Sequence, residues 1–239
     1  MLDNIKKELS GLSDKKQAQI SQKFFKTGPG EYGEGDIFLG IRVPMQRKVA
    51  AKYADLDIAG IADLLHSEFH EYRFTALAIL SARFCRAMKK ERAEIFRFYL
   101  NNTAFINNWD LVDASAYHIA GSFLSDKPRK ELYRLAHSEM LWERRIAIIA
   151  TLAFIRFGDF VDTFALSKIL LHDKEDLIQK AVGWMLRETG KKSLAGKEQL
   201  LGFLEENAPI MPRTCLRYAI ERLDAMQRKR FLGKKRRRS

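Results

Sequence analysis

Arg145-Ile146-Ala147-Ile148-Ile149 decides the fold, because similar stretches return along the chain at a regular interval. Each joins a basic residue to an apolar run, and beyond residue 44 the apolar residues fall at i, i+3, i+4 and i+7, the pattern of amphipathic helices. The counterparts lie at residues 73–77, 180–184 and 213–217, with 110–113 in the same phase. A recurrence of about 33–37 residues is typical of a two-helix repeat. The sequence therefore predicts an all-α, HEAT-like solenoid (an α-α superhelix) whose repeats bury their apolar faces against one another.

Helix starts and one turn-rich segment can also be placed. Capping residues and prolines mark five expected starts: at Pro44, after Asp57, after Asp126 ahead of Pro128, near Glu175 after Asp173, and near Pro209 and Pro212. Two further helices are expected over roughly 2–11 and 14–26, followed by a loop with four glycines between residues 28 and 35. No Gly-Lys-Ser/Thr follows those glycines, and Glu31, Glu34 and Asp36 would repel a phosphate, so a structured turn is predicted in place of a nucleotide-binding loop.

The net charge of +12 is concentrated at one end of the 239-residue chain. Residues 228–239 hold eight basic and no acidic side chains, and subtracting those eight leaves +4 for residues 1–227. We therefore expect a single helical domain over 1–227 and a basic tail over 228–239. The tail is expected to add nonspecific affinity for phosphates; the alternative is a solvated end without function.

Cysteine usage and hydropathy indicate the compartment. Cys85 and Cys215 lie in apolar helical patterns far apart in the sequence, which favours two reduced core thiols over a disulfide. The first residues contain no apolar leader segment, and no apolar run reaches the ~18 residues that a membrane span needs. We expect a cytoplasmic protein without a membrane partner.

The repeat also predicts that one position of each inner helix points into a shared concave groove. Those positions are held by Arg73, Asp110 or Asp113, Arg145, Lys180 and Arg213. A groove lined by Arg and Lys with a carboxylate at one position suits the binding of a polyanion around which the protein curves. The carboxylate would then mark the position at which the polyanion reacts. The alternative is that these basic residues are solvated or paired with nearby carboxylates. Arg42, just ahead of the helix that Pro44 opens, is a further expected phosphate contact beside that helix's free N–H groups.

Five segments resemble the AlkD-like DNA alkylation repair family, and they follow one another in the family's order. They are FFKTGPGEYGEGD at 24–36, FLGIRVP at 38–44, NWDLVD at 108–113, WERR at 142–145 and IQKAVGWMLRE at 178–188. The Trp-Asp-x-Val-Asp and Gln-Lys-Ala-(Ile/Val)-Gly-Trp patterns are specific when they occur together.

The resemblance implies a HEAT-like DNA glycosylase that hydrolyses the N-glycosidic bond of N3- and N7-alkylated purines in duplex DNA. It also implies that the lesion stays stacked, unlike the flipped base of most glycosylases. By matching position, Asp113 would be the catalytic carboxylate, Trp109 and Trp184 the aromatic walls beside the damaged nucleotide, and Arg145 a contact near a phosphate.

Two positions depart from a well-known member of the family. Phe24 stands where that member has a tyrosine, and Asn108 replaces the first tryptophan of a Trp-Trp pair. We keep Phe24, with Arg42, Arg73, Arg145 and Lys180, as an expected DNA contact. The implied enzyme uses no metal or other cofactor, is a monomer, and acts in the cytoplasm on DNA of the nucleoid.

These residue types suit that chemistry. An alkylated purine is already cationic, so it can leave without a general acid while positive charge develops on the deoxyribose. A carboxylate such as Asp113 can stabilise that charge and orient the attacking water. Indole faces attract a cationic base or sugar.

Other interpretations stay open on the residues alone. A tryptophan on a repeat helix is more often core than catalytic. Asp110 and Asp113 are an acid–base pair or helix N-terminal charges, and we assign Asp110 to structure. His66 and His70 stand at i, i+4 like a metal pair, which the lack of a third ligand disfavours. The alternative function is a non-catalytic HEAT-repeat module that binds DNA or scaffolds proteins.

Overall fold

The structure is a computed structural model that describes residues 1–233. Over that range the regular elements are helices, and β pairing is limited to an isolated parallel bridge between Ile37 and Phe69. The chain divides into two compact units, Met1–Ile119 and a second that begins at Ala120.

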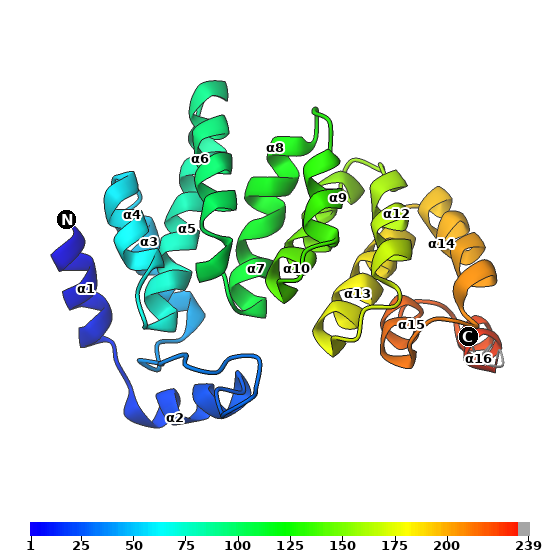
Figure 1. The fold of residues 1–239 in the computed structure, drawn as a ribbon, viewed down its shortest axis with the longest axis horizontal. Helices are drawn as coiled ribbons and strands as arrows, with labels where there is room; N and C mark the ends of the chain where they lie inside the picture. The colour runs from blue at the N-terminus through cyan, green and yellow to red at the C-terminus, as the bar shows by residue number, and fades with distance from the viewer. Residues whose placement is uncertain (234–239) are drawn as a thin grey trace. The chain divides into compact units, whose positions relative to one another are not determined.

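The first unit holds α1 to α7 and the beginning of a π-helical turn (Figure 1). Its elements are α1 (Leu2–Gly11), α2 (Lys15–Phe24), α3 (Val43–Lys52), α4 (Ile58–Leu65), α5 (His70–Arg86), α6 (Lys89–Asn101), a 3-10 turn (Thr103–Phe105), α7 (Trp109–Ala116) and the π-helical turn (Tyr117–Gly121). Side-chain caps fix two of the starts. Asp14 accepts a hydrogen bond from the Gln17 amide at 3.0 Å, and Asp57 accepts one from the Gly60 amide at 2.9 Å.

The second unit continues the helical pattern. Its elements are α8 (Ser122–Leu124), α9 (Lys130–Ala136), α10 (Leu141–Ala150), α11 (Leu152–Ile155), α12 (Val161–Leu170), α13 (Asp176–Lys192), α14 (Leu194–Asn207), α15 (Arg213–Ala219) and α16 (Ala225–Gly233). Pro212 precedes α15, and Glu175 is the first capping position of α13, close to the start expected after Asp173.

Within each unit one long helix packs against several neighbours. In the first unit α5 contacts α3, α4, α6 and α7; in the second, α13 contacts α10, α12, α14 and α15. The repeated stretches of the sequence lie on α5, α7, α10, α13 and α15. These are the helices that the repeat pattern assigned to equivalent positions, so the predicted all-α solenoid is confirmed. The basic groove, which would draw on both units, stays a prediction, as does the single domain over 1–227.

The beginning of the basic tail is helical in this structure. Residues 228–233 complete α16, where Phe231 is fully buried and Arg230 forms an ion pair with Glu205 at 2.6 Å. Arg213 donates a hydrogen bond to the carbonyl of Leu232 at 3.1 Å. Residues 234–239 lie outside the described residues. The tail as predicted therefore overlaps a packed helix by six residues.

The two cysteine thiols differ in their exposure to solvent. Cys215 is a buried core residue, and burial raises its pKa to about 12. Cys85 is exposed, so its prediction as a core thiol was wrong: it lies near the end of α5, where its neighbour Phe84 points into the core and the Cys85 side chain does not. As for membranes, none of the helices described over 1–233 has the length and hydropathy of a bilayer span.

Candidate active site

Asn108 determines where α7 begins. Its side chain is fully buried, its backbone is extended, and its Oδ1 accepts a hydrogen bond from the Trp109 amide at 2.8 Å. Its Nδ2 donates to Asp36 at 3.1 Å. Because Asp113 follows Trp109 by about one helical turn, the two side chains project from the same face of α7.

Trp109 and Asp113 line one cavity of about 540 Å³, which lies wholly within the first unit. Its walls come from α2, the loop after it, α3, α5 and α7. The lining residues are Gln17, Ile20, Ser21, Phe24, Phe25, Phe38, Ile41, Arg42, Val43, Gln46, Arg47, His70, Glu71, Phe74, Trp109, Asp110, Asp113 and Ala114. Trp109 and Asp113 are both half-buried, so each presents part of its side chain to this space. The cavity thus combines aromatic walls, the two carboxylates of α7 and two arginines.

A row of rings supports Trp109 from behind. The Trp109 ring stacks on Phe25 with centroids 5.3 Å apart, Phe25 stacks on Phe38 at 5.0 Å, and Phe38 stacks on His70 at 4.5 Å. We call these four rings the aromatic stack. Phe24 meets Trp109 edge-on at 5.9 Å and is 64% exposed. The structure therefore brings Phe24, Trp109 and Asp113 together around one cavity, while the roles that the resemblance implies for them stay predictions.

At the inner end of the aromatic stack, His70 is held between two carboxylates. Its Nδ1 lies 3.0 Å from Asp36 Oδ2, and its Nε2 lies 2.9 Å from Asp110 Oδ2. Although burial of this ring opposes the charged form, Asp110 and Asp36 raise the pKa of His70 to about 9. For Asp36 burial favours the neutral acid, but the hydrogen bond from His70 and the charge of Arg73 outweigh it and lower the pKa. His70 is therefore an imidazolium at neutral pH.

These contacts correct one prediction and answer an open question. Arg73 is 4% exposed, and its guanidinium donates to Asp36 at 2.5 Å and to the Ser67 and Glu68 carbonyls at 2.9 and 3.2 Å. Arg73 therefore has no surface to offer a DNA phosphate, and the predicted phosphate contact is replaced by an internal ion pair.

The contacts of His66 and His70 also disfavour a metal site at this pair. Both ring nitrogens of His70 face carboxylates, while His66 bonds to Asn102 at 2.7 Å.

The glycine-rich loop is a structured turn, as predicted, and its own carboxylates occupy its amides. Glu31 accepts from the Gly28 amide at 3.0 Å and Glu34 from the Gly30 amide at 2.8 Å. Farther on, the buried carboxylate of Glu71 accepts from three successive amides, those of Leu39, Gly40 and Ile41, at 2.8–3.2 Å. These amides are thus unavailable to an external anion, and the loop is held firmly against α5.

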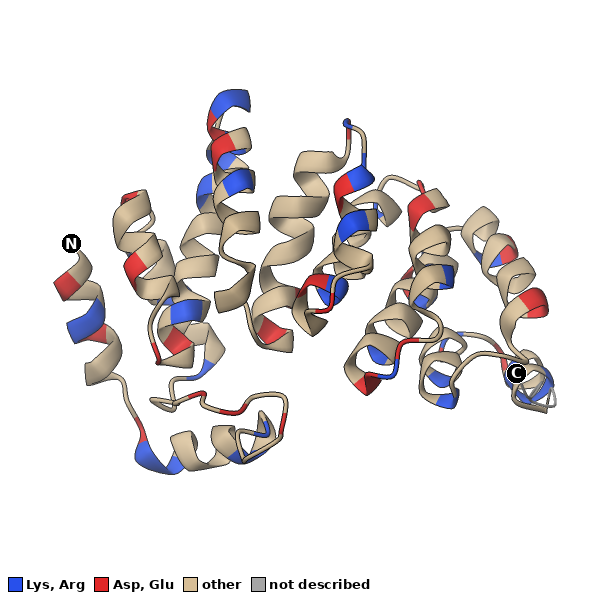
Figure 2. Cartoon of the chain, in the orientation of Figure 1, with Lys and Arg blue, Asp and Glu red and all other residues tan. Residues whose placement is uncertain are grey.

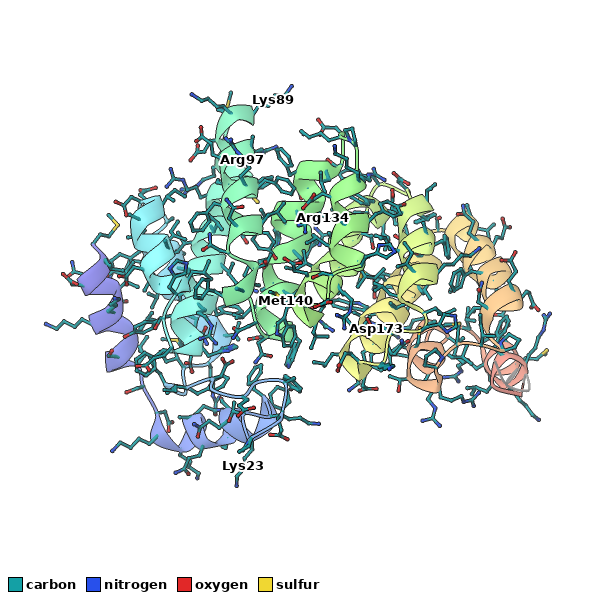
Figure 3. All side chains as sticks on the ribbon, viewed as in Figure 1. Lys23, Lys89, Arg97, Arg134, Met140 and Asp173 are labelled. Atoms are coloured by element: carbon teal, nitrogen blue, oxygen red, sulfur yellow. The ribbon has the colours of Figure 1, made fainter. Side chains whose placement is uncertain are left out.

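The exposed basic residues near the cavity are Arg42 and Arg47. Arg42 is the capping position of α3, and both side chains line the cavity. Lys23, at the end of α2, and Lys89, at the start of α6, lie at opposite ends of the first unit (Figure 3). Lys and Arg elsewhere are spread over the helices with acidic residues among them (Figure 2). The phosphate contact predicted for Arg42 stays a prediction, and its exposed position suits it.

The remaining predicted residues belong to the second unit. Trp184 on α13 is half-buried, and its indole N–H donates to Glu188 at 3.3 Å. Lys180, 40% exposed, pairs with Asp176 one turn earlier at 2.7 Å. Arg145 is 4% exposed and donates to the carbonyl of Leu177 at 2.5 Å. Arg145 thus joins α10 to α13 from the inside, as Arg73 joins α5 to two loops, which corrects its prediction as a surface contact to phosphate.

Sequence reasoning missed Asp36, His70, Phe25 and Phe38 as parts of this site. Phe25 lies in the helix expected over 14–26, and Phe38 follows the loop of four glycines. Neither was singled out within the segments that resemble the family, and His70 was weighed only as a metal ligand. The available signal was Asp36: a carboxylate that ends a glycine-rich loop and is followed by apolar residues is a candidate for burial with a cationic partner.

Comparison with known proteins agrees with this architecture. The model of a family described as "DNA alkylation repair enzyme" matches residues 5–223. A solved structure described as "Predicted DNA alkylation repair enzyme from Enterococcus faecalis" superposes with a TM-score of 0.67 over 89% of this chain and 97% of that one, at 17% sequence identity. That likeness concerns the fold. A search of curated protein sequences gives no match.

Proposed function

The chain belongs to the DNA alkylation repair enzyme family, and from this premise we propose that it is a DNA glycosylase acting on cationic N3- or N7-alkylated purines in duplex DNA. The reaction is hydrolysis of the N-glycosidic bond. The observation that carries the proposal is the pairing of Trp109 with Asp113 on one face of α7, at the opening of an aromatic cavity.

Asp113 would stabilise the transition state. A cationic purine is a good leaving group, so bond cleavage needs no general acid, and positive charge builds on the deoxyribose. A carboxylate held beside C1′ stabilises that charge and can orient the water that attacks from the same side. Neutral bases leave less readily and gain less from a carboxylate, which gives selectivity without an enclosing base pocket.

Trp109 and Trp184 would provide aromatic faces for the cationic nucleotide. A cation over an indole is stabilised by about 0.5–2 kcal/mol. Trp109 is suited to this because Phe25 stacks on one face of its indole and holds the ring in place. Trp184 is half-buried with its N–H engaged by Glu188, which favours a fixed orientation of that indole.

The remaining parts of the proposal follow from the substrate. Arg42 and Lys180 would contact phosphates, and Phe24, exposed beside Trp109, would contact the duplex near the lesion. The base stays stacked, so no pocket has to hold a flipped nucleotide. We propose a monomer that uses no cofactor and acts in the cytoplasm on DNA of the nucleoid.

The test is base release from a duplex that carries one 7-methylguanine, measured under single-turnover conditions with and without a chelator. Asp113→Asn should lower the rate by about a hundredfold or more, as removal of a comparable electrostatic group does. Its affinity for the duplex should stay within about threefold, since a rim charge contributes little to phosphate binding. Asp55→Asn is the matched control, because this aspartate is 88% exposed and lies away from the cavity.

The outcomes separate the two functions considered. Full release by Asp113→Asn would remove the catalytic assignment. Duplex binding by the unaltered protein with no release of any alkylated purine would identify a non-catalytic DNA-binding module.

A further inference from the structure

His70 connects three segments of the first unit that are distant in sequence. It is the first residue of α5, Asp36 belongs to the loop between α2 and α3, and Asp110 belongs to the first turn of α7. The side chains of His70, Asp36 and Asp110 are 2%, 3% and 12% exposed. Charged groups with so little access to water need partners within the protein, because water cannot solvate them. Asp36 also accepts from Arg73 and Asn108, and Asp110 also accepts from the Leu111 amide.

Only the imidazolium satisfies both carboxylates. Each ring nitrogen must donate, and a neutral imidazole has a single N–H, so deprotonation would turn a lone pair toward one buried carboxylate. Of the other charged groups on α5, Arg73 pairs with the second oxygen of the same Asp36, Oδ1, while Glu71 accepts from the loop amides. Asp110 receives no such guanidinium from the residues that the structure describes, so the imidazolium is its ion-pair partner. Asp113 of α7 lines the same cavity and adds a further negative charge. The raised pKa of His70 agrees with this arrangement.

The contacts of His70 lead to Trp109 by two routes. Asp110 is the next residue after Trp109, so the ion pair at 2.9 Å fixes the backbone from which the indole projects. The imidazolium ring also packs against Phe38 and Phe25, with ring centroids 4.5 Å and 5.0 Å away. Phe25 in turn stacks on the Trp109 ring. A cation beside two phenyl rings strengthens this packing relative to a neutral side chain.

We propose that His70 is a positioning residue for base release: by donating to Asp36 and Asp110 at once, it holds the first turn of α7, and with it Trp109 and Asp113, in their alignment at the cavity. This rests on the proposed glycosylase function for its kinetic consequence only. The alignment itself is a property of the protein without DNA, so it can be measured separately.

The experiment combines two measurements on His70→Gln, with His66→Gln as the control. His66 is an exposed histidine of the same unit whose contacts are with Asn102 and the Phe105 ring, neither of which lines the cavity. The first measurement is the ¹⁹F spectrum of protein labelled with 5-fluorotryptophan, recorded from pH 6 to 10, with the Trp109 signal assigned by Trp109→Phe. The second is single-turnover release of 7-methylguanine from a duplex at neutral pH.

In the unaltered protein and in His66→Gln, the Trp109 signal should titrate with a midpoint near pH 9. In His70→Gln that step should disappear and the signal should move or broaden at neutral pH, while the other two tryptophan signals stay in place. Release should fall by about tenfold to a hundredfold, the effect of a small misplacement of reacting groups. The duplex affinity should change by less than about threefold, because His70 does not reach the surface.

A Trp109 signal that is unchanged in His70→Gln, or release at the full rate, would overturn the proposal. If the unaltered protein releases no base, the proposed function fails, and the fluorine spectrum still decides whether His70 holds Trp109. Asp110→Asn covers the case in which His70→Gln does not fold. Its amide oxygen can still accept from Nε2, but the lost charge should lower the midpoint of the Trp109 titration; an unchanged midpoint would also overturn the proposal.

Discussion

At the scale of single residues, the charge on His70 links stability to pH. The pKa of this histidine is about 9 in the folded protein, against 6.5 for the unfolded chain. Its contribution is therefore complete below about pH 6.5 and is lost as the pH rises through 9. We expect the free energy of unfolding to fall over that window, by at most about 3 kcal/mol. Urea unfolding at a series of pH values measures it.

His70→Gln should remove this decrease in the free energy of unfolding between pH 6.5 and 9. If the free energy of unfolding has the same slope against pH in both proteins, the expectation is contradicted. Asp36 acts in a different window. Its lowered pKa means that its contribution is present above its ordinary value of 3.8 and is lost only as the pH falls below it. The alkaline titration therefore reports His70 without interference from Asp36.

The candidate site could be predicted in part at this scale. The resemblance singled out Trp109 and Asp113, and their spacing of four residues puts them on one face of any helix that contains both, which is a local property. His70 and Asp36 lie 34 residues apart, and nothing in either segment alone indicates that they meet. Arg73 and Arg145 failed for a related reason: a basic residue at a helix start is compatible with a groove or with a buried ion pair, and only the packing decides.

At the scale of elements, α2 depends on one glycine. Gly40 has φ +84°, and a Cβ there would lie 2.1 Å from the Asp14 carbonyl oxygen and 2.5 Å from the Ala18 amide. Gly35 has φ +85° with open space around it. Both substitutions to alanine incur the left-handed backbone penalty of about 1–2 kcal/mol. Gly40→Ala must in addition displace α2, so we expect it to cost at least about 2 kcal/mol more than Gly35→Ala in urea unfolding.

The displacement should also reach the site, because α2 carries Phe24 and lines the cavity. Gly40→Ala should therefore slow base release while Gly35→Ala leaves it near normal. Equal stability losses in the two variants would show that α2 is not held by this close approach.

The positions of the helices were largely predictable from the sequence. Which of their side chains are buried by neighbouring elements was not. Asp57 gave its helix start to the residue, and the helix expected near Pro209 and Pro212 begins directly after Pro212, because capping is decided by neighbours in sequence. The second helix ends at Phe24, two residues before the expected limit, where Lys26 adopts φ +52° as the chain turns. Cys85 shows the other limit: its apolar neighbourhood in sequence did not reveal that its side chain is exposed near the end of α5.

At the scale of the whole molecule, the basic end should govern the salt dependence of DNA binding. Five basic residues fall between 234 and 238. Deleting residues 234–239 should reduce the slope of log affinity against log salt by up to about 4, while single-turnover release stays unchanged. Cutting at 228 would be uninformative, because it removes the buried Phe231 from α16. Replacing the five basic residues with glutamine is the control for chain length; an unaltered slope in both proteins would assign no role to the basic end.

The repeat pattern gave the class of fold, because each repeat must bury its apolar stripe against the next. The chain's division near Ile119 was not foreseen, since the apolar periodicity runs through that point without a break. There the helix widens into a π-helical turn, Tyr117–Gly121, and Gly121 allows the Ala150 carbonyl to approach to within 2.2 Å of the position a Cβ would take.

The unequal thiols have a practical consequence. Cys85 is open to reagents at the far end of the helix that begins with His70, while Cys215 is enclosed and its thiolate is disfavoured at neutral pH. A maleimide should thus attach to the native chain at Cys85 alone, without the introduction of a cysteine. The protein could be tethered to a sensor surface through that point, leaving the face that carries Trp109 turned toward the DNA in solution.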